Sequence, residues 1–134
     1  MPNILVLDDD ATIRELFNYV FQEAGYTVQT AVNGREALDM LAGGGFIPDV
    51  MLVDISMPVM TGTEFIENFK KLQARAANLR NIPFIIMTGE NFMDADIVKE
   101  FRNNRCCRSF VPKMTNPDEV VAKVNEILAK EGKI

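Results

Sequence analysis

The sequence predicts an α/β protein built on a doubly wound parallel sheet of five strands. Two observations lead to this prediction: five short apolar runs recur along the chain, and each is followed by a segment with helical periodicity. Alternating strands and helices are typical of a parallel sheet covered by helices on both faces. The 134 residues suffice for one compact core. The chain shows no internal repeat or low-complexity tract, so we expect a single domain over residues 1–134.

The expected strands are short and almost wholly apolar. Runs of about four to five apolar residues are typical of strands that are buried on both faces of a sheet. Strands are therefore predicted at residues 4–7, 26–30, 50–53, 84–87 and 109–111.

Capping signals mark the first two helices. Thr12 and Glu15 have the spacing of a capping box, and Gly25 is a stop signal for the helix that they begin. Asn33 begins the second helix, which ends at the glycine run 43–45. Apolar residues at helical spacing predict one buried face on each: Ile13, Leu16, Phe17, Val20, Phe21 and Ala24 on the first, and Ala37, Leu38 and Leu41 on the second.

Three further helices are predicted. Thr61 and Glu64 form a second capping-box pattern, and the fifth helix begins at 116–119 with a cap, a first-turn proline and two acids at the positive end of the helix dipole. The expected inward residues are Phe65, Ile66, Phe69 and Leu72 on the third helix, Ile97, Val98 and Phe101 on the fourth, and Val120, Val121, Val124, Ile127 and Leu128 on the fifth.

Composition excludes several classes of function. The net charge of −5 argues against a nucleic-acid surface, which would need a basic face. No apolar run approaches the roughly 20 residues of a membrane span, and no signal peptide precedes the first strand. The adjacent Cys106 and Cys107 favour a reducing, cytoplasmic location without a disulfide. The absence of histidine removes the commonest general base and zinc ligand.

Polar side chains gather where the strands end. Five parallel strands favour the flavodoxin-like order 2-1-3-4-5, in which ligands bind at the carboxyl ends of the first and third strands. Three aspartates, residues 8–10, follow the first strand and Asp54 follows the third. Thr88 follows the fourth strand and Lys113 the fifth. Asp10 is expected only to cap the first helix. Topology therefore brings Asp8, Asp9 and Asp54 to one edge.

Carboxylates this close repel each other unless one is protonated or a cation holds them. Oxygen ligands suit Mg²⁺, with Mn²⁺ or Ca²⁺ as alternatives. Lys113 offers a positive charge to a phosphate oxygen, and Thr88 offers a hydroxyl donor. Because an aspartate can attack phosphorus and form an acyl phosphate, the pattern predicts transfer of a phosphoryl group onto Asp54.

Four motifs carry a resemblance to a known family. "ILVLDDD", "LVDISMPVMTG", "IIMTGE" and "VPKM", in this order over nearly the whole chain, resemble the receiver domain of two-component response regulators. The resemblance implies that Asp54 is the phosphoacceptor. It further implies Mg²⁺ (or Mn²⁺) held by Asp8, Asp9, Asp54 and the carbonyl of Ser56, and a switch pair of Thr88 and Phe110. Ser56 and Glu90 match positions that tune dephosphorylation.

The resemblance also implies partners for the chain. At one position the sequence departs from the family pattern. A histidine kinase or phosphotransfer protein would donate the phosphoryl group, and an unknown output protein would read it, in a stand-alone, chemotaxis-regulator-like signalling switch. The family usually places proline directly after the lysine, often across a cis bond, whereas here the order is Pro112-Lys113-Met114. A cis Lys113–Met114 bond would cost about 3–4 kcal/mol, so we expect a trans bond.

Two other functions fit parts of the pattern. One is a Mg²⁺-dependent phosphohydrolase with an aspartyl nucleophile, but Ser56 stands where such enzymes commonly carry a second aspartate. The other is a receiver-like scaffold that binds partners without phosphorylation, which would be expected to lack some of the acidic residues. A dinucleotide-binding domain is disfavoured because no G-x-G-x-x-G motif follows a strand.

Overall fold

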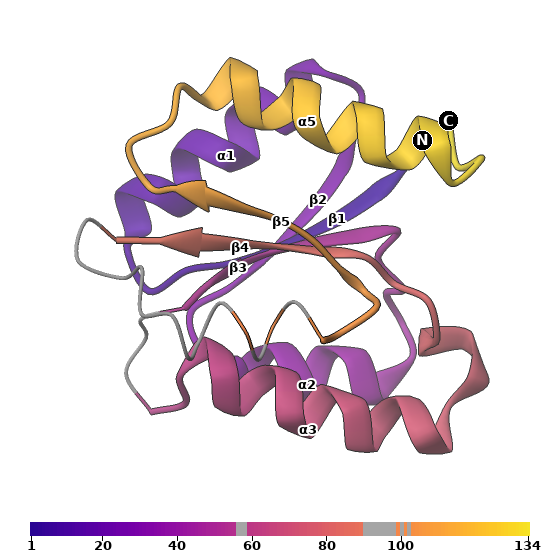
Figure 1. The fold of residues 1–134 in the computed structure, drawn as a ribbon. Helices are drawn as coiled ribbons and strands as arrows, with labels where there is room; N and C mark the ends of the chain where they lie inside the picture. Colours follow the sequence, from indigo (N-terminus) through magenta and orange to yellow (C-terminus); the bar gives the residue numbers. More distant parts are fainter. Residues whose placement is uncertain (56–58, 90–98, 100, 102) are drawn as a thin grey trace.

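A computed structural model describes residues 1–55, 59–89, 99, 101 and 103–134. The sheet has the parallel order β2-β1-β3-β4-β5, which confirms the predicted fold class. Helices α1 and α5 cover one face of the sheet, and α2 and α3 cover the other (Figure 1). The described elements are β1 (Asn3–Leu7), α1 (Ala11–Glu23), β2 (Thr27–Ala31), α2 (Gly34–Gly43), β3 (Val50–Asp54), α3 (Gly62–Arg75), the 3₁₀ helix η1 (Ala77–Leu79), β4 (Phe84–Thr88), β5 (Cys107–Pro112) and α5 (Pro117–Lys130).

The central strands have no solvent-facing side. Every residue of β3 and β4 is buried, as expected for strands with helices on both faces. The edge strand β2 alternates between exposed and less exposed side chains, because successive side chains point to opposite faces of the sheet. The β5 strand begins two residues before the predicted segment and ends one residue after it.

Most predicted helix starts are confirmed, and one is wrong. Thr61 caps α3 in a complete capping box with Glu64, and the Asn33 side chain caps α2. The predicted capping box of Thr12 and Glu15 does not form, whereas the expected cap Asp10 is confirmed, since its side chain accepts hydrogen bonds from the backbone N–H groups of Thr12 and Ile13. Since α1 already begins at Ala11, Thr12 lies inside the helix and cannot cap it.

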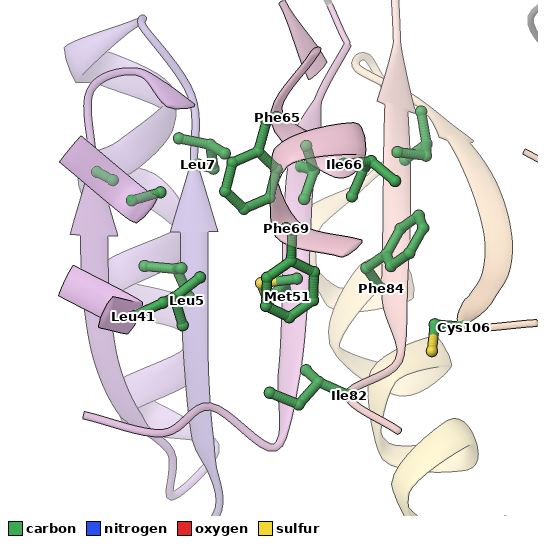
Figure 2. Packing of buried hydrophobic residues seen from close by; sticks show 14 of the residues in the cluster. Leu5, Leu7, Leu41, Met51, Phe65, Ile66, Phe69, Ile82, Phe84 and Cys106 are labelled. Atoms are coloured by element: carbon green, nitrogen blue, oxygen red, sulfur yellow. The ribbon is translucent and has the colours of Figure 1, made fainter. Parts of the chain in front are cut away.

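Two apolar cores lie on opposite faces of the sheet. Figure 2 shows the one beneath α2 and α3, where Phe65 and Phe69 of α3 stack with ring centroids 5.9 Å apart in the same cluster as Met51 of β3. The other core joins Phe17 and Phe21 of α1 to the sheet and to α5. Of the residues predicted to face inward on α1, Leu16 is 41% exposed and Ala24 is also exposed, and neither takes part in this core.

Part of one prediction cannot be compared with the structure. The expected fourth helix falls mainly on residues 90–98, 100 and 102, outside the described residues. Within the described part, Phe101 is buried as predicted and contacts Phe84 edge to face. Among the helices that are described, none combines the length and the apolar character needed to cross a bilayer.

Candidate functional site

Two carboxylates are buried side by side at the carboxyl edge of the sheet. β1 pairs with β3 so that Leu7 lies opposite Val53, which places the next residues, Asp8 and Asp54, in neighbouring positions. Both side chains are inaccessible to solvent, whereas Asp9 is exposed. One carboxylate oxygen from each of these three aspartates lies within 4.8 Å of the others. The predicted acidic cluster is therefore assembled.

Lys113 reaches this cluster from β5. Its Nζ lies 2.8 Å from Asp54 Oδ2 and 3.7 Å from Asp8 Oδ1. Its backbone N–H donates a 2.9 Å hydrogen bond to the carbonyl of Thr88, so the β4–β5 pairing fixes the residue beyond the end of the strand. No cis peptide bond occurs in the described chain, as expected for Lys113–Met114. The altered proline position does not keep the lysine away from Asp54.

The buried charges shift each other's protonation. Burial raises the pKa of Asp8 to about 6; the charge of Asp54 adds to this shift, and the Asp10 N–H and Lys113 oppose it. The Asp10 N–H donates a 2.9 Å hydrogen bond to Asp8 Oδ1. For Lys113, burial lowers the pKa, but the hydrogen bond and charge of Asp54 together with the charge of Asp8 raise it above its ordinary value overall.

The cluster has the properties of a site for a hard cation. Within the described residues, Asp8 Oδ2 is buried and accepts no hydrogen bond, and a buried anionic oxygen without a partner is costly. The available donors are carboxylate oxygens, which Mg²⁺ prefers over softer ligands. The residues present thus fit a divalent ion. The carbonyl of Ser56, a further expected ligand, lies outside the described residues, as does Glu90.

The expected switch pair occupies adjacent strands. Thr88 ends β4 and is 5% exposed, and Phe110 in β5 lies opposite Ile86. Because side chains alternate along a strand, this register places Phe110 on the same face of the sheet as Thr88. Phe110 is half-buried and packs edge to face on Phe101 at a centroid distance of 6.2 Å.

Sequence reasoning missed two residues that support the site. Arg14 of α1 donates a 2.7 Å hydrogen bond to the backbone carbonyl of Asp8; its position one turn into the helix after the aspartates was the only available signal. Gly62 lies against the end of β3, where an added Cβ would be 2.7 Å from the carbonyl oxygen of Asp54 and from Ile55 Cα.

A parallel five-stranded sheet with an acidic cluster and a lysine at its carboxyl edge is the arrangement of a receiver domain. The sequence model of the response regulator receiver domain matches residues 4–125, and the chain belongs to that family.

Relatives and solved structures agree with this assignment. The response regulator SaeR of Staphylococcus epidermidis is 29% identical over 133 residues, which are 99% of this chain and 53% of SaeR. The sensor histidine kinase CheAY of Helicobacter pylori is 38% identical over 85 residues, 63% of this chain and 10% of CheAY. The chain thus spans about half the length of the SaeR relatives and a small part of CheAY.

Two structures illustrate the likeness of the fold. The chemotaxis protein CheY4 of Vibrio cholerae superposes with a TM-score of 0.76 at 30% identity, covering 96% of this chain and 99% of CheY4. The response regulator TrrA of Thermotoga maritima, in complex with Mg(2+)-BeF, gives a TM-score of 0.73 at 31% identity, covering 96% of this chain and 100% of TrrA.

Proposed function

We propose that the chain is a phosphorylation switch that accepts a phosphoryl group on Asp54. The observation that carries the proposal is that Asp54 lies beside a cation, Lys113 Nζ at 2.8 Å, and within 4.8 Å of carboxylate oxygens of Asp8 and Asp9. A nucleophile for phosphorus needs positive charge around it to stabilise the negative charge of the transferring group. Lys113 supplies one such charge, and a divalent ion held by the three carboxylates would supply the other.

The metal in this proposal is Mg²⁺, with Mn²⁺ as an alternative. Asp8, Asp9 and Asp54 would hold it, together with the carbonyl of Ser56. When bound, the ion would neutralise charge on the phosphoryl oxygens and relieve the repulsion among the carboxylates. The presence of Mg(2+)-BeF in the structure of TrrA supports this choice for the present chain.

The donor would be a phosphohistidine of a histidine kinase or phosphotransfer protein. A carboxylate oxygen of Asp54 forms the new P–O bond as the P–N bond to the donor's imidazole breaks, and the imidazole leaves with the electron pair and takes up a proton. Likeness to part of the sensor histidine kinase CheAY supports a two-component pathway. These 134 residues contain no histidine, so the phosphohistidine that donates the group lies outside them.

Thr88 and Phe110 would change conformation when Asp54 is phosphorylated. The Thr88 hydroxyl would donate a hydrogen bond to the phosphoryl group, and the movement of Thr88 would free space for the Phe110 ring to turn inward. The changed surface would then bind a different output protein, without direct contact to nucleic acid or membrane. We propose that this happens in the cytoplasm, with residues 1–134 acting as one receiver domain and a signalling switch rather than a turnover enzyme.

The test is intact mass after incubation with acetyl phosphate and Mg²⁺. We expect the mass to rise by one phosphoryl group in the wild type and to stay unchanged in Asp54→Asn. Asp39→Asn, which alters an exposed aspartate of α2, is the matched control and should still gain the group. A gain that survives Asp54→Asn would refute the proposal, and so would sustained hydrolysis of an added phosphoester, which would favour the phosphohydrolase.

A further inference from the structure

A polar cavity lies at the opposite edge of the sheet from Asp54. It has a volume of about 380 Å³ and opens between the C-terminal half of α3 and the segments that lead into β4 and β5. Because these segments precede their strands, the cavity is at the amino edge of the parallel sheet, whereas the acidic cluster is at the carboxyl edge. It therefore shares no residue with the proposed phosphorylation site.

Cations and amides line this cavity. Lys70, Arg80 and Arg105 supply the positive charges, and Gln73, Asn81, Asn103 and Asn104 supply amide groups. No Asp or Glu occurs among the lining residues described. The three cations also form no ion pair within the described part of the chain, where the ion pairs involve Arg108, Lys113 and Lys130.

The charge of the cavity contrasts with that of the protein. Residues 1–67 carry two basic and eleven acidic side chains, whereas residues 68–134 carry twelve basic and eight acidic ones. Two segments, 68–89 and 101–117, contain no Asp or Glu at all. These are the segments that face each other across the cavity, so its positive charge is a local feature of a chain whose net charge is −5.

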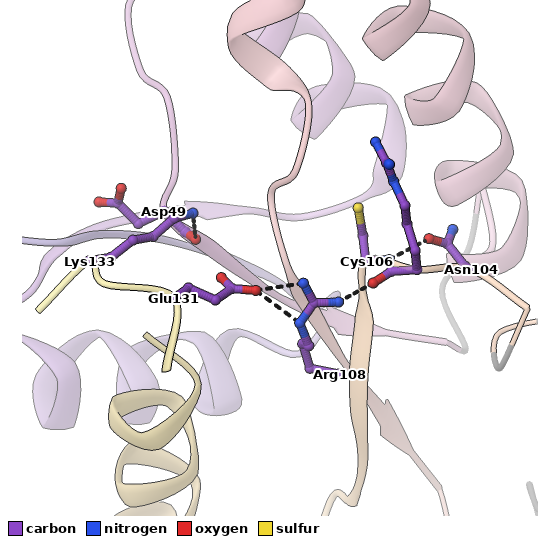
Figure 3. Close-up of polar contacts among 7 residues, drawn as sticks. Asp49, Asn104, Cys106, Arg108, Glu131 and Lys133 are labelled. Atoms are coloured by element: carbon purple, nitrogen blue, oxygen red, sulfur yellow. Dashed lines mark hydrogen bonds and ion pairs between the residues drawn. The ribbon is translucent and has the colours of Figure 1, made fainter. Parts of the chain in front are cut away.

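Hydrogen bonds hold the rim of the cavity in place. The Asn104 side chain accepts a 2.9 Å hydrogen bond from the Cys106 N–H, and Arg108, paired with Glu131, also donates to the Arg105 carbonyl (Figure 3). On the other wall, Arg80 Nε donates to the Gln73 carbonyl at 3.3 Å, and Gln73 Nε2 donates to the Leu79 carbonyl at 2.9 Å. The backbone on both sides is thus fixed by contacts that leave the charges of Lys70 and Arg105 available.

We propose that this cavity binds a small ligand that carries two or more phosphate groups. Arginine binds phosphate oxygens through paired N–H donors and lysine adds a point charge. Three cations around one hollow give it a positive potential, which attracts a polyanion. The volume lies in the range of small-molecule pockets, which favours a compact ligand over a macromolecule.

The test is calorimetric titration of the full chain with inorganic pyrophosphate in buffer containing EDTA, so that no divalent ion links the ligand to the acidic cluster. We expect pyrophosphate to bind at least tenfold more tightly than inorganic phosphate. The double variant Arg80→Gln/Arg105→Gln should weaken binding at least tenfold. The matched control Lys123→Gln/Lys130→Gln removes the same charge from α5 and should bind as the wild type does, as should Asp54→Asn.

Several outcomes would overturn the proposal. They are undetectable binding, equal weakening by the cavity and control variants, or tighter binding of an oligoglutamate peptide than of pyrophosphate. Circular dichroism of the double variant checks that it folds. If it does not, Lys70→Gln alone must weaken binding several-fold, and unchanged affinity would overturn the proposal. ADP in place of pyrophosphate distinguishes the sources of the phosphates: tighter binding identifies a nucleotide, and equal binding identifies the diphosphate itself.

Discussion

Lys113 Nζ lies 2.8 Å from Asp54 Oδ2, so a lysine at the end of β5 compensates a fully buried carboxylate at the end of β3. The same amino group is 3.7 Å from Asp8 Oδ1. One cation therefore faces two buried carboxylates, and this imbalance of charge leads to the first two predictions.

Removing the Lys113 charge should destabilise the metal-free protein. Lys113→Met keeps most of the aliphatic chain but leaves two buried carboxylates without their cation, and we expect a loss of about 2 kcal/mol in the free energy of unfolding. Lys130→Met is the matched control, because it breaks an exposed pair with Glu126 that is worth less than about 0.5 kcal/mol. Urea denaturation in EDTA measures both, and equal losses would contradict the prediction.

Asp8→Asn should stabilise the metal-free protein at neutral pH. The amide keeps the oxygen that accepts the Asp10 N–H but removes a buried charge. A pKa raised from 3.8 to about 6 corresponds to a cost of about 2–3 kcal/mol once Asp8 is ionised. The same variant should lose most of the stabilisation that Mg²⁺ gives the wild type.

The extra stability of Asp8→Asn over the wild type should depend on pH. A carboxyl group with a raised pKa binds its proton more tightly in the folded state, so its contribution to stability is greatest below about pH 4 and declines as the pH rises through 6. The stability difference between Asp8→Asn and the wild type should therefore be small near pH 4 and reach its full size above pH 6. A difference that shrinks as the pH rises would contradict the assignment.

The strands, most helix caps and the cluster of Asp8, Asp9 and Asp54 could be predicted because each depends on local pattern or on the rules of parallel-sheet topology. The short distance between Lys113 and Asp54 could not be predicted, since it depends on the hydrogen bond that the Lys113 N–H donates to the Thr88 carbonyl between β4 and β5. The cap of α1 was ambiguous because Asp10 and Thr12 could each cap it. The charged cavity needs two segments brought together by the fold, which no single stretch of sequence indicates.

Val59 stands in a backbone conformation that a β-branched residue rarely adopts. Its φ is 69° and its side chain is 81% exposed, so the strain is not offset by burial. Val59→Asn and Val59→Gly should each stabilise the protein, by about 0.5–1 kcal/mol, because both residues tolerate this region. Thermal denaturation tests this. A lower melting temperature in both variants would show that contacts of the Val59 side chain outweigh the strain of its backbone.

Gly62 should not tolerate a side chain. A Cβ there would lie 2.7 Å from the Asp54 carbonyl oxygen and from Ile55 Cα, and both contacts are backbone atoms that cannot swing aside. Gly62→Ala should therefore cost about 2 kcal/mol or more and slow the labelling of Asp54, since the end of β3 must shift. Gly43→Ala in α2 is the matched control: its Cβ would meet nothing within 4 Å, and its stability should stay equal or rise.

The two cysteines should react slowly with thiol reagents in the folded protein. Cys106 is 6% exposed, and burial raises the pKa of Cys107 from 9.0 to about 11, with the neighbouring Cys106 adding to the rise and the Ser109 N–H and Arg108 opposing it. The thiolate is the reactive form, so a rise of two pKa units lowers its population about 100-fold near neutral pH.

Reaction with dithionitrobenzoate at pH 8, before and after unfolding in guanidinium, measures this protection. We expect slow release of thionitrobenzoate from the native wild type and from both single variants, Cys106→Ser and Cys107→Ser, and rapid release from each after unfolding. Fast reaction of native Cys106→Ser would show that Cys107 is more accessible than its half-buried position implies. Since Cys106 also lines the cavity beside Arg105, pyrophosphate bound there should slow the native reaction of Cys107→Ser further and leave that of Cys106→Ser unchanged.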